Sequence, residues 1–119
     1  MTPIHEIPGQ VVVKPDLWRI DSANAEEFRK ELEGGLKKAL ERRPHPRLVV
    51  DFANVNFMSS AGLRQVINVQ REAKTNNRIR GGMILRFGPV SKRIQRALDL
   101  AGFLPLFKTE DLDTSEEVD

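Results

Sequence analysis

Two adjacent serines, Ser59 and Ser60, are followed by Ala61 and Gly62 at the point where an apolar stretch gives way to a helical pattern. A serine hydroxyl just before a helix can accept a hydrogen bond from a free backbone N–H, so capping is the ordinary use of such a residue. The same place also suits a phosphate, because free N–H groups and the positive end of the helix dipole favour an anion. Ala61 and Gly62 remove bulk from the first turn, which predicts a surface that another protein can approach closely.

The other reactive side chains do not favour catalysis. His5 lies in the N-terminal segment and His45 lies between two prolines. A triad of Ser60, His45 and Asp51 has the right residue types, but no G-x-S-x-G elbow accompanies it. No two histidines have metal-ligand spacing, and the glycine pairs match neither a P-loop nor a dinucleotide fingerprint. We therefore expect a protein that is not an enzyme and that carries no metal and no cofactor.

The composition bounds the class of protein. A chain of 119 residues with 39% hydrophobic and 30% charged residues predicts a single soluble domain. It has no cysteine, no apolar run of transmembrane length and no signal-peptide pattern, which fits a cytoplasmic protein with no membrane insertion. Six of the 17 acids follow Thr109, so the preceding body holds all 19 bases and is strongly basic. Because these bases are scattered with few aromatic neighbours, we expect a solvated surface or an acidic protein partner rather than direct nucleic-acid binding.

The elements that must position the serines follow an alternating pattern. Strands that alternate with amphipathic helices predict an α/β fold, in which a mixed β-sheet is flanked by helices in the order ββαβαβαβ. A domain over 1–108 would then be followed by an acidic C-terminal tail or linker over 109–119. The first expected elements are a hairpin over 10–20 that turns at Pro15 and Asp16, and a helix that is capped by Asp21 or Ser22 and stopped by Pro44 and Pro46. A strand over 48–52 and a helix after the serines should follow. The last elements should be a strand over 83–87, a helix over 90–101 and an edge strand over 103–107.

The central stretch "LVVDFANVNFMSSAGLRQVI" (48–67) resembles the central segment of STAS domains, the anti-sigma-factor antagonists of bacteria. "RIDSANAEEFRKEL" (19–32) is similar to the stretch around that family's first helix. "GGMILRFGPVSKRIQRALDLAGFLPLF" (81–107) is similar to its C-terminal strand, helix and strand. The resemblance implies a mixed sheet with helices packed against it, in agreement with the element order.

The resemblance also implies a function. In regulatory members, a serine at the start of the second helix is phosphorylated by a serine kinase that doubles as an anti-sigma factor. The unphosphorylated antagonist binds this kinase and releases the sigma factor, whereas the phosphorylated form does not bind. Ser60 falls on the phosphoacceptor position, with Ser59 as the alternative. The expected partner-binding residues are Ser59, Ser60, Ala61, Gly62, Arg64, Asp21 and Asp51.

Three positions depart from the family pattern. Ser59 stands where an acid usually precedes the phosphoacceptor, and Ala61 stands where a serine often follows it. Trp18 stands where a glycine is common before a Leu-Asp pair that Ile20 and Asp21 match here. Asp51 matches an acid in the preceding strand, where capping of the next turn is as good an explanation as a regulatory role.

Two other functions stay open from the sequence. A STAS module can also serve as a stressosome scaffold, as the cytoplasmic domain of an anion transporter or as a lipid-transport accessory subunit. The acidic tail would suit such a role if it were a linker to a further domain. A small-ligand binder or nucleotide hydrolase is the other class, although no phosphate-cradling loop supports it.

Overall fold

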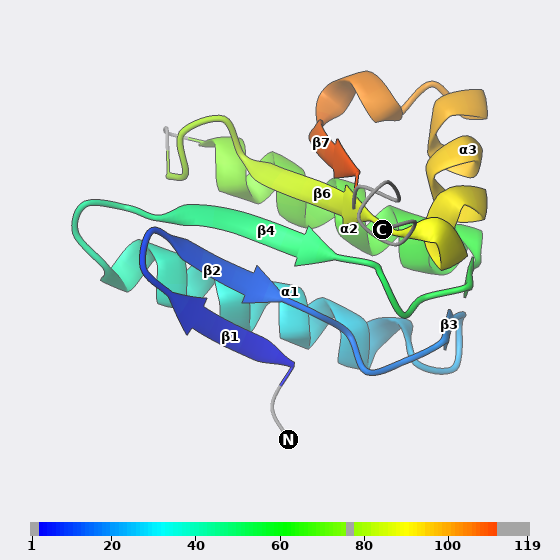
Figure 1. The fold of residues 1–119 in the computed structure, drawn as a ribbon, viewed down its shortest axis with the longest axis horizontal. Helices are drawn as coiled ribbons and strands as arrows, with labels where there is room; N and C mark the ends of the chain where they lie inside the picture. The colour runs from blue at the N-terminus through cyan, green and yellow to red at the C-terminus, as the bar shows by residue number, and fades with distance from the viewer. Residues whose placement is uncertain (1–2, 76–77, 112–119) are drawn as a thin grey trace, which may run out of the picture.

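A five-stranded sheet with helices on one face forms the body of the protein (Figure 1). The computed structural model describes residues 3–75 and 78–111. The strands span Ile4–Ile7 (β1), Gln10–Val13 (β2), Arg19–Ile20 (β3), Arg47–Asp51 (β4), Phe57–Met58 (β5), Met83–Phe87 (β6) and Lys108–Asp111 (β7). The order is β1-β2-β4-β6-β7, in which β1 is antiparallel to β2 and the other neighbours are parallel. The mixed α/β class predicted from the sequence is therefore confirmed.

Helices connect the parallel strands and pack their apolar stripes on the sheet. The α-helices are Ala25–Glu41 (α1), Ser60–Lys74 (α2) and Lys92–Leu100 (α3), and the 3-10 turns are Pro89–Ser91 (η2) and Leu104–Leu106 (η3). α1 and α2 lie side by side on the same face of the sheet (Figure 1). Between these helices and the sheet, Phe28, Phe52 and Phe87 are fully buried, with ring centroids 6.3 Å and 5.7 Å apart along the row. The core thus lies between the sheet and this helical layer.

The parallel strands bring the expected site to one end of the sheet. β2, β4 and β6 all point toward the end of the molecule where α1 and α2 begin (Figure 1). The short ribbon of β3 and β5 lies at this same end. Among the described residues, none of the helices combines the length and the apolar character that a membrane crossing requires.

The hairpin predicted over 10–20 is wrong. β2 pairs instead with β1, with Ile7 opposite Gln10, and the turn between them contains Gly9 at a φ of 77°. Glycine reaches a positive φ easily, so Gly9 allows the tight turn that joins β1 to β2. No hairpin turns at Pro15 and Asp16. The second half of the predicted hairpin, Arg19–Ile20, pairs in parallel with β5.

The strand predicted over 103–107 is also wrong. Residues Leu104–Leu106 form η3, and the last strand runs instead over Lys108–Asp111. The carbonyl of Leu106 accepts bonds from the side-chain amide of Gln70 (2.8 Å) and from Lys74 Nζ (3.2 Å), which hold this turn against α2. Residues 109–111, assigned to the acidic tail from the sequence, therefore belong to the sheet. The remainder of that predicted tail, 112–119, lies outside the described residues.

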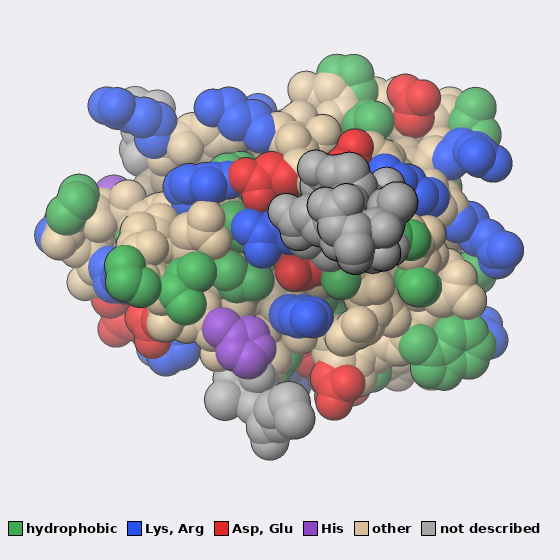
Figure 2. All heavy atoms as spheres, viewed as in Figure 1, with side chains coloured by type: hydrophobic (Ala, Val, Ile, Leu, Met, Phe, Trp, Pro, Cys, Tyr) green, Lys and Arg blue, Asp and Glu red, His purple; other side chains and the backbone are tan. Residues whose placement is uncertain are grey.

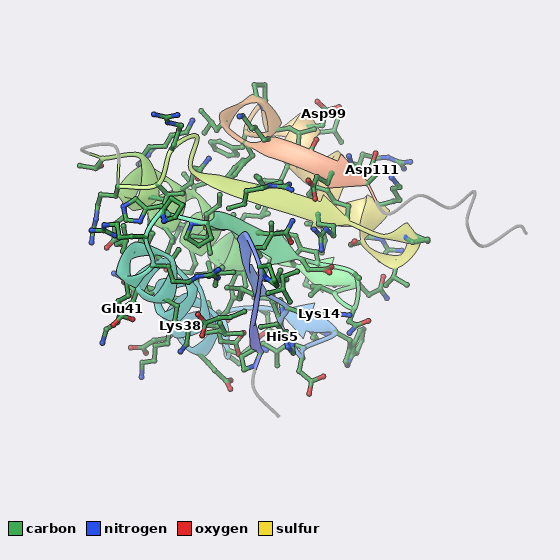
Figure 3. All side chains as sticks on the ribbon, turned by 60° about the vertical axis from the view of Figure 1, so that its left-hand side comes forward. His5, Lys14, Lys38, Glu41, Asp99 and Asp111 are labelled. Atoms are coloured by element: carbon green, nitrogen blue, oxygen red, sulfur yellow. The ribbon has the colours of Figure 1, made fainter. Side chains whose placement is uncertain are left out.

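The face of the sheet opposite α1 and α2, the open face, mixes apolar and charged side chains (Figure 2). Its charged row crosses three strands, because Asp51, Arg86 and Glu110 occupy one register. Arg86 contacts Glu110 at 3.1 Å and Asp51 at 3.7 Å, and Arg47 also pairs with Glu110. His5 and Lys14 lie on the hairpin at one edge of the sheet, while Asp111 ends β7 at the other edge (Figure 3).

We expect Glu110→Gln to lower stability at neutral pH and to have less effect in acid. Burial tends to raise the pKa of Glu110, but hydrogen bonds and charge from Arg47 and Arg86 outweigh it and hold this pKa below its usual range. A lowered folded-state pKa adds stability above the unfolded pKa, and this contribution is lost as pH falls through the folded pKa. Urea unfolding of both proteins should therefore give a free-energy difference that is largest near pH 7 and shrinks below about pH 5.

The exposed Glu41 on α1 supplies the control for this experiment. Glu41 is in no ion pair among the described residues, so near pH 7 Glu41→Gln should lower the unfolding free energy less than Glu110→Gln does. A difference for Glu110→Gln that does not vary with pH would mean that the two arginines do not act on this carboxylate.

Candidate partner-binding site

The serine motif is held by the ribbon of β3 and β5. The carbonyl of Trp18 accepts bonds from the N–H groups of Asn56 (2.7 Å) and Phe57 (3.2 Å), and the carbonyl of Ile20 accepts one from Ser59 (2.8 Å). Ser59 is thus fixed by its backbone before α2 begins. This pairing, which joins segments nearly 40 residues apart, sets where the first turn of α2 sits.

Ser59 is the N-cap of α2, but its side chain makes no capping bond. Its Oγ atom is buried and has no hydrogen-bond partner among the residues that the structure describes. The hydroxyl cap that the sequence predicted for this junction is therefore not formed. The first helical bond runs from the N–H of Leu63 to the carbonyl of Ser59, so the N–H groups of the residues between them have no partner within the helix.

Ser60 is the first residue of α2, and it is exposed. Arg64 follows one turn later on the same side of the helix and is also exposed. Because α2 has no acid in its first turn, its positive dipole end is not offset there by a carboxylate. The geometry can therefore accept an added anion on the Ser60 hydroxyl, whereas the Ser59 hydroxyl faces the interior.

Gly62 does not serve the role that the sequence predicted. It is buried, and a Cβ atom at this position would lie 2.7 Å from Met58 Cγ and 2.8 Å from Ile20 Cγ2. The glycine is needed because α2 packs closely onto the ribbon of β3 and β5. The expectation that Gly62 opens a surface for a partner is therefore corrected, although Ala61, next to it, remains partly exposed.

Asp21 follows β3 and so lies beside the residue that follows β5, Ser59. Its carboxylate accepts a bond from the N–H of Ala23 (3.0 Å) and pairs with Arg19 at 3.1 Å. Asn24 is the N-cap of α1, although its side chain instead bonds the N–H of Asp21 and the carbonyl of Arg19. Asp21 is thus an ordered part of the same surface, and the prediction that Asp21 or Ser22 is the N-cap of the helix is wrong.

Asp51 lies on the open face at the end of β4, where one oxygen accepts the N–H of Ala53 at 2.8 Å and the other lies 3.7 Å from Arg86. This is the turn-capping arrangement that the sequence offered as one of its two explanations. His45 precedes the other end of β4, so the five-residue strand separates it from Asp51 by on the order of 15 Å. The triad of Ser60, His45 and Asp51 therefore does not form.

Three side chains that lie together beside the serine motif were not identified from the sequence. Arg19 lies over the rings of Trp18 and Phe57, with its guanidinium carbon 5.8 Å and 5.1 Å from their centroids. Trp18 is 62% exposed. Its departure from the family pattern was the available signal, but the pairing of β3 with β5 is what brings the three together.

Within the described parts of the chain, no group of three or more His, Asp or Glu side chains is placed to hold a metal ion. What the site does offer is a surface. It consists of an exposed hydroxyl at a helix start, an arginine one turn away and an ordered ribbon beside them. Such an arrangement is suited to binding another protein and to carrying a phosphate.

The STAS domain family model matches residues 3–116 of this chain, and the chain belongs to this family. Among curated proteins it is similar to BtrV of Bordetella bronchiseptica, a candidate anti-sigma factor antagonist. The two are 33% identical over 88 residues, which is 74% of this chain and 67% of BtrV.

Solved structures share the fold at lower identity. The unphosphorylated form of the anti-sigma factor antagonist SpoIIAA is 17% identical with a TM-score of 0.63, covering 98% of this chain and 91% of that one. A candidate anti-sigma factor antagonist from Thermotoga maritima is 16% identical with a TM-score of 0.68 over the same shares of the two chains. The phosphorylated form of SpoIIAA, described as a Bacillus cell fate determinant, gives a TM-score of 0.58 at 17% identity and covers 98% and 95%.

Proposed function

We propose that this chain is an anti-sigma factor antagonist that is switched by phosphorylation of Ser60. In this proposal the unphosphorylated protein binds a serine kinase that is also an anti-sigma factor, in the cytoplasm, and so releases a sigma factor. The role is one of binding rather than catalysis. Membership of the STAS family and the name of its relative BtrV support the antagonist function.

The observation that carries the phosphorylation switch is the contrast between the two serines. Ser60 is exposed at the start of α2, whereas the Oγ atom of Ser59 is buried. A kinase must reach the hydroxyl that it modifies, so Ser60 is the acceptor and Ser59 is not. A phosphate on Ser60 would meet the positive end of the helix dipole and leave the fold intact while it changes the surface.

We expect Ser60→Ala to remain folded, to bind the anti-sigma factor and to resist phosphorylation. The probe is a recombinant serine kinase of the anti-sigma type encoded by the same genome, incubated with ATP and each variant. Ser59→Ala is the matched control, because it removes only a buried hydroxyl that has no partner within residues 3–75 and 78–111, and this variant should still be phosphorylated. Intact-mass and fragment-ion mass spectrometry then locate the phosphate.

The position of the phosphate, on Ser60 or on Ser59, decides whether the proposal holds. Phosphate on Ser59, with Ser60→Ala modified normally, would reject Ser60 as the acceptor. If none of the kinases binds or modifies the wild-type chain, the antagonist function itself is wrong.

A further inference from the structure

Trp18 is a large apolar side chain that the protein holds out to solvent on an ordered frame. It is 62% exposed, yet its carbonyl accepts bonds from both Asn56 (2.7 Å) and Phe57 (3.2 Å). Arg19 stacks against the Trp18 ring and against Phe57. Holding the indole in this way lowers the entropy that would be lost when it is buried by a partner.

The ribbon of β3 and β5 makes this aromatic surface continuous with Ser60. Ile20 and Met58 are paired and point into the core, so their strand neighbours Arg19 and Phe57 face outward. Ser60 lies three residues beyond Phe57, a distance of about 10 Å in extended chain. Trp18 and Ser60 therefore fit within one interface of ordinary size, about 800 Å² on each partner.

The charges of this surface indicate what can cover it. The cation of Arg19 is already paired with Asp21 at 3.1 Å, so it does not require an acid from a partner. In the described part of the chain, the indole N–H of Trp18 has no hydrogen-bond acceptor. A surface that complements Trp18 is thus an apolar recess with one hydrogen-bond acceptor at its rim.

We propose that Trp18 is an anchor of the anti-sigma factor interface and sets its specificity by filling such a recess. This inference rests on the proposed function and extends it to a residue at which this chain departs from the family pattern. Buried tryptophans are prominent among the residues that dominate binding energy, and each buries about 150–250 Å². Leu100 on α3 is even more exposed, at 82%, but it lies outside the ribbon of β3 and β5. Exposure alone therefore does not identify an anchor residue.

Trp18 is the only tryptophan of the chain, which makes it a built-in reporter. The chain is labelled with 5-fluorotryptophan and titrated with the anti-sigma kinase that binds the wild-type protein. We expect its single ¹⁹F resonance to shift on binding. By calorimetry, Trp18→Ala should weaken the affinity by at least about tenfold, and Trp18→Phe, which keeps an aromatic ring, should weaken it less. Leu100→Ala is the control and should bind like the parent.

Each outcome separates this proposal from the function on which it rests. If Ser60→Asp loses binding while Trp18→Ala, shown by circular dichroism to be folded, keeps parental affinity, the anchor is wrong and the antagonist function stands. An unchanged ¹⁹F resonance at saturation overturns the anchor in the same way. If the wild-type chain binds none of the anti-sigma kinases, the proposed function fails and the anchor fails with it.

Discussion

A Ser60→Asp protein is expected to keep the parental fold and to lose about tenfold or more in affinity for the anti-sigma factor, equivalent to ~1.4 kcal/mol. Ser60 is the first residue of α2 and is exposed, so an aspartate enters without displacing a packed side chain. A negative charge at this helix end is favourable, and the free energy of unfolding should be unchanged or slightly higher. Within an interface, however, the same carboxylate would be desolvated without a partner, which is costly.

Ser60→Asn is the matched control for this prediction, because asparagine has nearly the same shape and no charge. We expect it to bind closer to the parent than Ser60→Asp does, as measured by calorimetry. If both variants bind weakly, the interface excludes bulk rather than charge. Parental affinity in both would place the partner somewhere other than the first turn of α2.

Much of the fold follows from local patterns in the sequence. Leu48, Val50 and Leu85 lie in near-continuous apolar runs, which are typical of buried strands, and all three belong to the core between the sheet and the helical layer. The apolar stripes of the helices recur every three or four residues, and the structure buries these stripes against the sheet. Pro44 and Pro46 follow the end of α1 at Glu41, as expected for residues that stop a helix.

Non-local pairing accounts for the elements that the sequence did not predict. A run such as Arg19–Ile20 has the same composition whether it pairs with a neighbour in the chain or with a segment nearly 40 residues away. Its partner, Phe57–Met58, is too short to be recognised as a strand by periodicity. The hairpin prediction failed here because β2 could pair with the segment on either side of it. The Gly9 turn pairs β2 with β1, which precedes it, and not with the segment that follows Pro15 and Asp16.

The candidate site was predicted in position but not in the orientation of its residues. The sequence places Ser59 to Gly62 at a strand-to-helix junction, and the structure has them there. Which hydroxyl faces outward depends on the phase of α2, and that phase is set by the pairing of β3 with β5. The same pairing turns Gly62 inward and keeps Phe57 beside Arg19 on the outer side.

Gly62→Leu is expected to destabilise the fold severely, and Gly62→Ala by about 1–3 kcal/mol. Alanine would gain up to ~1 kcal/mol of helix propensity over glycine, but its Cβ would lie 2.7 Å from Met58 Cγ and 2.8 Å from Ile20 Cγ2. Neither atom is the free end of a flexible chain, and Ile20 is fully buried, so the contact cannot be relieved cheaply. Leucine adds three further carbons in the same direction.

Gly34→Ala is the matched control, since Gly34 also lies within a helix and its added Cβ would meet only the end of the Ile4 side chain, at 3.0 Å. Urea unfolding should therefore show Gly34→Ala near the parent or more stable, and Gly62→Ala clearly less stable. A Gly62→Leu protein with parental stability and weakened partner binding would contradict this reasoning, because it would mean that Gly62 faces the partner rather than the core. Loss of binding in proportion to loss of folded protein is what the close packing of α2 on the ribbon of β3 and β5 predicts.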